Sequence, residues 1–287
     1  MTLGFVILGI GAVLVGLDQF SNRVLTPAPH VPDRTVPETG VAHEDFSIRS
    51  GDHELAAFLL LPSSDARRPL LLLAHGWGAS YATLLQLAEP LVADGYEVLL
   101  FDVRGHGRNP PTDYVTIRHF RDDVMAATRY ARDRWADRPI VLIGHSLGGS
   151  AAVLATAEGS PADAAVLVAA PSDVMKVTAE FMSEKGMPGD LMVMLLRPFW
   201  WRRAGSLFGP LTPSRRIREL TIPLLMIQPE HDHRVARPHA DRLAAASGQP
   251  YTLIEGAGHT DVLGREETHM AVRTFLESTF RTEAGEA

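Results

Sequence analysis

Ser146 stands in a sequence context that could make it a nucleophile. Residues 144–148 read Gly-His-Ser-Leu-Gly, and they directly follow the apolar run 139–143. An apolar strand, flanking glycines and a following helical run are typical of a sharp strand-to-helix turn with the serine at its corner. Such a turn holds the hydroxyl within reach of a general base. The pattern therefore predicts a nucleophile elbow, with an inert serine at a glycine-rich helix start as the alternative.

A serine hydroxyl needs a general base, and His259 is the best placed of the twelve histidines. It ends the segment Gly-Ala-Gly-His, directly after the last apolar run, and loops at strand ends carry catalytic groups in such folds. Asp232 is the predicted carboxylate that orients the imidazole, because it follows the apolar run ending at Gln228. The chain order is then Ser, Asp, His. Glu230 remains open as the competing carboxylate.

Acyl transfer also needs donors for the negative oxygen that develops on the substrate, and two backbone N–H groups usually supply them. Leu147, directly after the serine, is the first predicted donor. The second is expected in the turn His-Gly-Trp-Gly at 75–78, where Trp77 is the predicted donor. A plain strand-to-helix turn is the alternative interpretation of this segment.

These groups need a scaffold, and after residue 41 the sequence alternates apolar runs with longer helical patterns. We expect a hairpin formed by 46–49 and 55–61, then strands at 70–74, 98–102, 140–143, 165–169, 224–228 and 251–255. Helices are expected at about 82–94, 117–135, 147–158, 237–246 and 268–280. Such alternation predicts an α/β fold with a parallel sheet.

Together these residues resemble the α/β-hydrolase superfamily, in particular its esterase-, lipase- and serine aminopeptidase-like members. The resemblance covers nearly all of residues 42–280. It depends on the segments 75–78, 102–107, 144–148 and 222–225, on Asp232, and on Gly258-His259. It implies an α/β-hydrolase fold with a mostly parallel sheet of eight strands flanked by helices, and a two-step acyl-enzyme mechanism without a cofactor. One departure is Gln228-Pro229, where relatives often carry His-Gly or similar.

Residues 172–213 interrupt the alternation of strands and helices, and the resemblance implies that an insertion here is a small helical cap over the active site. The insertion contains the apolar runs 191–196 and 199–201. A charged substrate would leave ions unpaired against such side chains, so an ester with an apolar acyl group is favoured. The predicted function is a serine hydrolase of carboxylic esters. Acyltransferase, thioesterase or peptidase activity at the same residues stays open, and a non-catalytic binding module is a more distant alternative.

Composition narrows the range of partners. The 287 residues carry a net charge of −7, so the chain has no electrostatic footprint for nucleic acid. There is no cysteine, which excludes disulfides and thiolate metal sites. His231 and His233 flank Asp232, but no other group of ligands accompanies them. We therefore expect a small ester or lipid-like molecule as partner, with no metal and no cofactor.

The N-terminus differs from the rest of the chain. Residues 2–17 carry no charge and consist mostly of aliphatic residues and glycine. This run predicts an N-terminal membrane anchor over residues 1–20, with a signal peptide as the alternative. Arg23 and Arg34 follow the apolar run and no basic residue precedes it. The positive-inside rule then favours a membrane-anchored protein with a cytoplasmic catalytic domain.

Four prolines, at positions 27, 29, 32 and 37, follow the apolar run. Prolines at this density predict an extended, semi-rigid linker over residues 21–40. The hydrolase-like domain is then expected over residues 41–287, with the cap at about 172–213.

Overall fold

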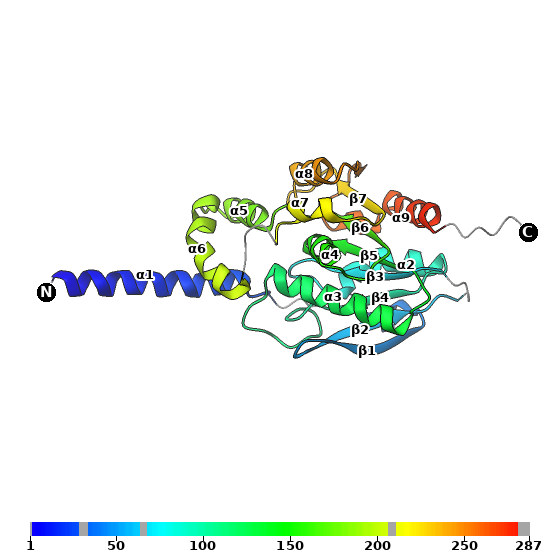
Figure 1. Cartoon of the computed structure of the whole chain (residues 1–287), viewed down its shortest axis with the longest axis horizontal. Helices are drawn as coiled ribbons and strands as arrows, with labels where there is room; N and C mark the ends of the chain where they lie inside the picture. The colour runs from blue at the N-terminus through cyan, green and yellow to red at the C-terminus, as the bar shows by residue number, and fades with distance from the viewer. Residues whose placement is uncertain (1, 29–33, 64–67, 206–210, 281–287) are drawn as a thin grey trace, which may run out of the picture.

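The computed structural model describes residues 2–28, 34–63, 68–205 and 211–280. Its centre is a sheet of eight strands in the order β1-β2-β4-β3-β5-β6-β7-β8 (Figure 1). The strands are β1 (His43–Ser50), β2 (His53–Leu60), β3 (Leu70–Ala74), β4 (Val98–Phe101), β5 (Ile140–His145), β6 (Ala164–Val168), β7 (Leu224–Pro229) and β8 (Thr252–Ile254). β2 pairs antiparallel with β1 and β4, whereas all other neighbours are parallel. The predicted α/β fold with a mostly parallel sheet is confirmed.

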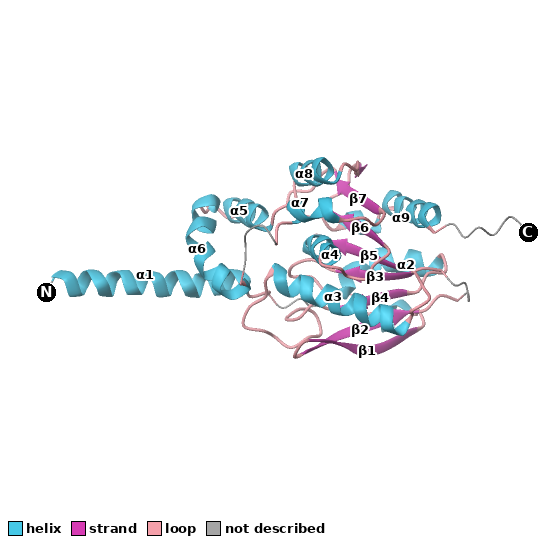
Figure 2. Ribbon diagram, in the orientation of Figure 1, coloured by secondary structure: helices cyan, strands magenta, loops and turns pink. Residues whose placement is uncertain are grey.

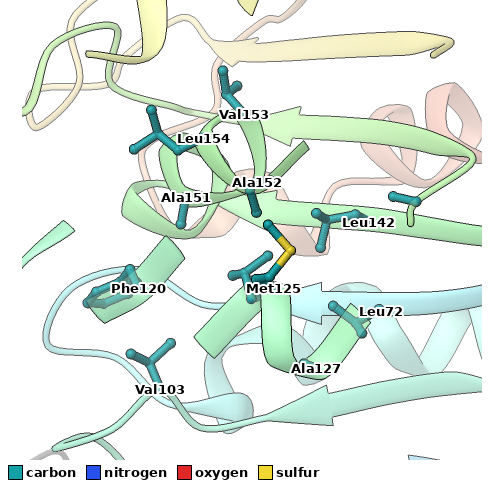
Figure 3. Packing of buried hydrophobic residues seen from close by; sticks show 14 of the residues in the cluster. Leu72, Val103, Phe120, Met125, Ala127, Leu142, Ala151, Ala152, Val153 and Leu154 are labelled. Atoms are coloured by element: carbon teal, nitrogen blue, oxygen red, sulfur yellow. The ribbon is translucent and has the colours of Figure 1, made fainter. Parts of the chain in front are cut away.

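The central strands are apolar throughout because both faces of the sheet are covered. β3, β4 and β5 are buried at every residue. Side chains alternate between the two faces along a strand. Leu72 and its register neighbour Leu142 therefore face one apolar cluster, while Leu71 and Val141 face the other. Figure 3 shows Leu72 and Leu142 in the first cluster together with Met125 of the covering helix.

Helices pack on both faces of the sheet, as Figure 2 shows. They are α2 (Tyr81–Ala93), α3 (Ile117–Arg134), α4 (Leu147–Ala157), α8 (Pro238–Ser247) and α9 (Glu266–Thr279). Side chains of α3, α4 and α8 join the cluster of Leu72, and those of α2 and α9 join the cluster of Leu71. The short helices are η1 (Pro37–Thr39), α7 (Pro213–Arg216), η2 (Ile217–Glu219) and η3 (Asp261–Gly264). Each of the five predicted helices is present, with ends within two residues of the prediction.

The predicted cap segment contains two helices, α5 (Val174–Glu184) and α6 (Gly189–Ala204). They approach closely at Gly189, where a Cβ atom would lie only 1.9 Å from the carbonyl oxygen of Ala179. Their apolar residues form a third cluster, apart from the two clusters on the sheet, with Leu196 and Trp200 fully buried in it. Residues 206–210 of the predicted cap lie outside the described residues.

The N-terminal segment forms one helix, α1 (Thr2–Leu25), which continues past the predicted anchor into the predicted linker. Figure 1 shows α1 at the end of the molecule where α5 and α6 lie. Within the described residues, no helix combines the length and the apolar character needed to cross a bilayer. The prediction of a membrane location through an anchor over residues 1–20 is therefore wrong, and a membrane as partner, which depended on that anchor, is not supported.

The polar residues that follow the apolar run explain the difference. Asp18 lies 2.9 Å from both Arg202 and Arg203 of α6, and the hydrogen bond from Arg203 lowers the pKa of Asp18. On the same half of α1, Leu17 and Phe20 pack against the apolar cluster of α5 and α6. The residues that follow the apolar run thus bind α5 and α6, and no pattern in the sequence indicated these contacts.

The described part of the predicted linker is also fastened to the core. The backbone N–H of Val115 donates to the carbonyl oxygen of Leu25 over 2.7 Å. The hydroxyl of Thr26 donates to the carbonyl oxygen of Asp113 over 3.0 Å. Val36 is fully buried. Residues 29–33 lie outside the described residues. Residues 25–28 and 34–40 are thus part of the packed structure and not a free spacer.

Candidate active site

Ser146 occupies a strained turn between β5 and α4. Its φ is +54° and its ψ is −124°, an unfavourable conformation for a residue with a Cβ atom. The neighbouring glycines are required by close backbone contacts. A Cβ at Gly144 would lie 2.5 Å from the nitrogen of Gly149, and one at Gly148 would lie 2.2 Å from the carbonyl oxygen of Ala74. The local geometry is therefore that of a nucleophile elbow.

His259 and Asp232 are joined directly. Nδ1 of His259 lies 2.7 Å from Oδ2 of Asp232, whose side chain is fully buried. The other carboxylate oxygen of Asp232 accepts hydrogen bonds from the backbone N–H groups of Arg234, over 2.9 Å, and Val235, over 2.8 Å. An ionised carboxylate has no hydrogen to donate and can only accept, so Nδ1 of His259 carries the hydrogen. In a neutral imidazole with its hydrogen on Nδ1, Nε2 is the atom that can accept a proton.

Ser146 is not joined to His259 in the way that His259 is joined to Asp232. Among the described residues, no hydrogen bond joins the hydroxyl of Ser146 to His259. Catalytic hydrogen bonds of this type often tighten only when substrate is bound. The loop of His259 nevertheless reaches the end of β5, because Nε2 of His145, the residue before Ser146, lies 2.7 Å from the carbonyl oxygen of His259.

Glu230, the competing carboxylate, binds elsewhere. Its Oε2 accepts a hydrogen bond from the backbone N–H of Gly256 over 2.9 Å. Its side chain is 43% exposed, and the neighbouring ring of His231 is 63% exposed. The geometry therefore selects Asp232 as the partner of His259. In the described part of the chain, no three His, Cys, Asp or Glu side chains form a group that could hold a metal ion.

The segment 75–78 passes beside the nucleophile. A Cβ atom at Gly76 would lie 2.8 Å from Cβ of Ser146 and 3.2 Å from its hydroxyl oxygen. Trp77 follows, and the centroid of its ring lies 5.4 Å from that of His106. Leu147 is the first residue of α4, so no carbonyl within the helix accepts its N–H. Both predicted donors are thus on backbone next to Ser146.

His75 fixes this segment, a role that the sequence analysis did not assign. Nδ1 of His75 donates to the carbonyl oxygen of Gly76 over 2.8 Å, and Nε2 accepts from the N–H of Val103 over 3.0 Å. Asp102 holds the adjacent turns by accepting from the N–H groups of Tyr81 and Arg108. Burial raises the pKa of Asp102 to about 6. The motif around 75 and 102 was visible in the sequence, but its hydrogen bonds depend on the folded chain.

A cavity of about 770 Å³ lies away from these residues. Its lining comes from α1, from the loop before α3 and from α6, and includes Asp18, Arg23, Tyr114 and Arg203. None of Ser146, Asp232 and His259 is among its lining residues. This polar cavity and the candidate active site are therefore separate features.

Comparison with known proteins agrees with this description. A family model described as serine aminopeptidase, S33, matches residues 65–195. The quorum-quenching protein AidA of Acinetobacter baumannii is 35% identical over 132 residues, which cover 44% of this chain and 43% of that protein. A bifunctional esterase/perhydrolase of Acinetobacter calcoaceticus is 28% identical over 162 residues, 53% of this chain and 56% of that protein. The chain thus spans about half the length of these two relatives.

Among solved structures, an esterase of Pyrococcus furiosus superposes with a TM-score of 0.70. The two sequences are 21% identical, and the match covers 89% of this chain and 98% of the esterase. At this identity the match is evidence of a shared fold. The sheet has the α/β-hydrolase fold, and residues 65–195 match a serine aminopeptidase family of that fold. The family match and the esterase/perhydrolase relative are similarities to serine hydrolases of the esterase-like class.

Proposed function

We propose that this enzyme hydrolyses carboxylic esters through an acyl-enzyme intermediate, with Ser146 as nucleophile, His259 as general base and Asp232 as the orienting carboxylate. One observation carries the proposal: the 2.7 Å hydrogen bond between Nδ1 of His259 and the buried carboxylate of Asp232. It leaves Nε2 as the proton acceptor at the edge of the sheet where Ser146 lies. The strained φ of +54° at Ser146 supports the same assignment.

In the first half-reaction the hydroxyl oxygen of Ser146 bonds to the ester carbonyl carbon, and its proton passes to Nε2 of His259. The carbonyl oxygen becomes negative and is stabilised by the backbone N–H groups of Leu147 and Trp77. Asp232 stabilises the imidazolium that forms. When the carbonyl re-forms, the bond to the alcohol oxygen breaks, and His259 returns the proton to the leaving alcohol.

The second half-reaction repeats these steps with water. His259 takes a proton from water, whose oxygen attacks the acyl carbon of the ester formed on Ser146. The oxyanion again lies against the same two N–H groups. Collapse of the intermediate releases the carboxylic acid, and the proton returns from His259 to the oxygen of Ser146. One ester and one water thus give one acid and one alcohol.

Two features favour an apolar acyl group. The segment that contains α5 and α6 is rich in methionine and leucine, with Met175, Met187 and Met192 half-buried around the apolar cluster of the two helices. The aromatic ring of Trp77 also lies beside the proposed oxyanion donors and stacks near Phe120, with 6.3 Å between ring centroids. Such side chains lose little by covering an aliphatic chain, whereas a charged group would be left unpaired.

The test is labelling with a fluorophosphonate, followed by a series of p-nitrophenyl esters of increasing acyl length. The wild type should be labelled, and Ser146→Ala should not. The matched control is Ser150→Ala, because Ser150 lies one turn further along α4 and its hydroxyl donates to the carbonyl oxygen of Pro171. This control should be labelled like the wild type. An unlabelled wild type would indicate a binding module and overturn the proposal.

The ester series tests the substrate class. We expect kcat/KM to rise from acetyl to medium-length acyl groups. A strict preference for acetyl esters would contradict the apolar acyl site. Faster turnover of thioesters or peptides, or transfer of the acyl group to added alcohols in place of water, would favour the alternative activities at the same residues.

A further inference from the structure

His145, the last residue of β5, directly precedes the proposed nucleophile. The residue is only 3% exposed, although it is polar and lies at the end of a strand. A buried polar side chain generally has a hydrogen-bonding role, because burial without a partner is costly. The proposed reaction steps do not use it. Its contacts show what it does.

The ring of His145 binds the backbone of the proposed base. Nε2 of His145 lies 2.7 Å from the carbonyl oxygen of His259. A carbonyl oxygen can only accept, so Nε2 carries the hydrogen and donates it. The two imidazole rings lie with centroids 4.9 Å apart and planes at 45°. Nδ1 of His145 is buried and has no hydrogen-bond partner among the described residues.

Burial also fixes the charge of this ring. It lowers the pKa of His145 to about 3, and the nearby charges of His259 and Arg234 act in the same direction, while Asp232 opposes them. His145 is therefore neutral over the whole range in which an imidazole base functions. A neutral neighbour does not repel the imidazolium that forms on His259 during the reaction.

The hydrogen bond from His145 joins the loop after β8 to a different segment of the protein than the other hydrogen bonds of this loop do. The others include those from Gly256 to Glu230, from His231 to Ala257 and from Gly258 to Asp261. They tie the loop to itself and to the segment after β7. The hydrogen bond from His145 instead runs to the end of β5, one residue from Ser146. It therefore fixes the distance between the backbone of the base and the strand that carries the nucleophile.

We propose that His145 is a positioning residue for hydrolysis: its ring N–H locks the backbone of His259 to the nucleophile-bearing end of β5. This inference rests on the proposed roles of Ser146 and His259. Without this hydrogen bond, the loop after β8 keeps its other hydrogen bonds but can shift relative to Ser146. A displacement of about 1 Å in a catalytic group costs about 100-fold in rate.

Two substitutions separate the hydrogen bond from the packing. His145→Phe fills the ring volume without a donor, and His145→Gln keeps an N–H donor at a similar reach. For the Phe variant we expect kcat to fall about 10- to 100-fold with KM within about twofold of wild type. The loss in log kcat of the Gln variant, relative to wild type, should be at most two thirds of the loss in the Phe variant. The downfield NMR signal of the proton between His259 and Asp232 should broaden in the Phe variant only.

The matched control is His269→Phe. His269 is another mostly buried histidine with one short hydrogen bond, 2.7 Å from Nε2 to Oδ2 of Asp94, but it lies on α9. This variant should lose thermal stability and keep the kcat of the wild type. A purely structural role for His145 predicts the same pattern for His145→Phe, and that result would overturn the inference. An equal loss of kcat in a folded His145→Gln variant would also overturn the inference, because the missing N–H donor would then not explain the loss.

Failure of the proposed function gives a different result. If Ser146→Ala were still labelled by the fluorophosphonate, the assignment of Ser146, His259 and Asp232 as a catalytic triad would be wrong. This conclusion would not depend on the activity of the His145 variants. If Ser146→Ala is unlabelled and His145→Phe has wild-type kcat, the triad stands and the positioning role falls.

Discussion

The indole nitrogen of Trp200 donates a hydrogen bond to the carbonyl oxygen of Ser21 over 3.2 Å, and so joins α6 to α1. Trp200 is 1% exposed, and Leu17, Phe20 and Val24 of α1 pack around the same cluster. The second half of α1 therefore covers the apolar surface of the cap helices. It acts as a third helix of the cap, although more than 150 residues of sequence separate it from α6.

Two truncations test this dependence. Deletion of residues 1–16 removes the part of α1 that precedes the contacts with α6 and should leave stability unchanged. Deletion of residues 1–25 exposes Trp200 and should cost about 3 kcal/mol, similar to truncating a large core side chain. Thermal melts of both proteins check the difference. Equal melting temperatures for the two truncations would show that α1 does not support the cap.

This contact also shows what the sequence could not reveal. The strands β3 to β6 were predictable because each is a continuous apolar run, buried on both faces. β1 begins at His43, before the predicted start, because its exposed residues give no apolar signal there. The role of α1 depends on contacts between residues 17–25 and 175–204, and no local pattern encodes such a pairing.

The carboxylate assignment gives a second prediction. Asp232→Asn should lower kcat by about 10⁴, because the amide cannot hold His259 in the tautomer with Nε2 free. Glu230→Gln should change kcat less than about tenfold, since the carboxylate of Glu230 contacts the N–H of Gly256 and the ring of His231 and not His259. Steady-state kinetics on one ester check both variants. A greater loss in Glu230→Gln than in Asp232→Asn would reverse the assignment.

For this pair, the sequence pointed to one segment and left Glu230 open beside Asp232. Both carboxylates follow β7 within three residues, so chain order alone did not distinguish them. The difference lies in the turn: Asp232 accepts from the N–H groups of Arg234 and Val235, which directs its free oxygen toward His259. The serine and the histidine were predictable because glycines mark both turns in the sequence.

The proposed oxyanion donors give a third prediction. Trp77→Pro deletes the backbone N–H and should lower kcat by about 10² to 10³, whereas Trp77→Phe keeps it and should have a mild effect. Circular dichroism must first show that the Pro variant is folded. Wild-type activity in a folded Trp77→Pro protein would remove Trp77 from the oxyanion site.

The buried ring of His145 makes a fourth prediction, about stability and pH. Its folded pKa of about 3 lies below the ordinary value of 6.5. Between these values the unfolded chain binds a proton that the folded protein does not, so the free energy of unfolding falls as the pH falls below about 6.5. At one pKa unit per 1.36 kcal/mol, lowering the pH to 5 should cost about 2 kcal/mol through this residue.

His145→Gln has no such group and should lose about 2 kcal/mol less than the wild type between pH 7 and pH 5. Urea unfolding at both pH values measures this difference, in which the other titrating groups cancel. Parallel losses in the two proteins would show that His145 is not held neutral by burial.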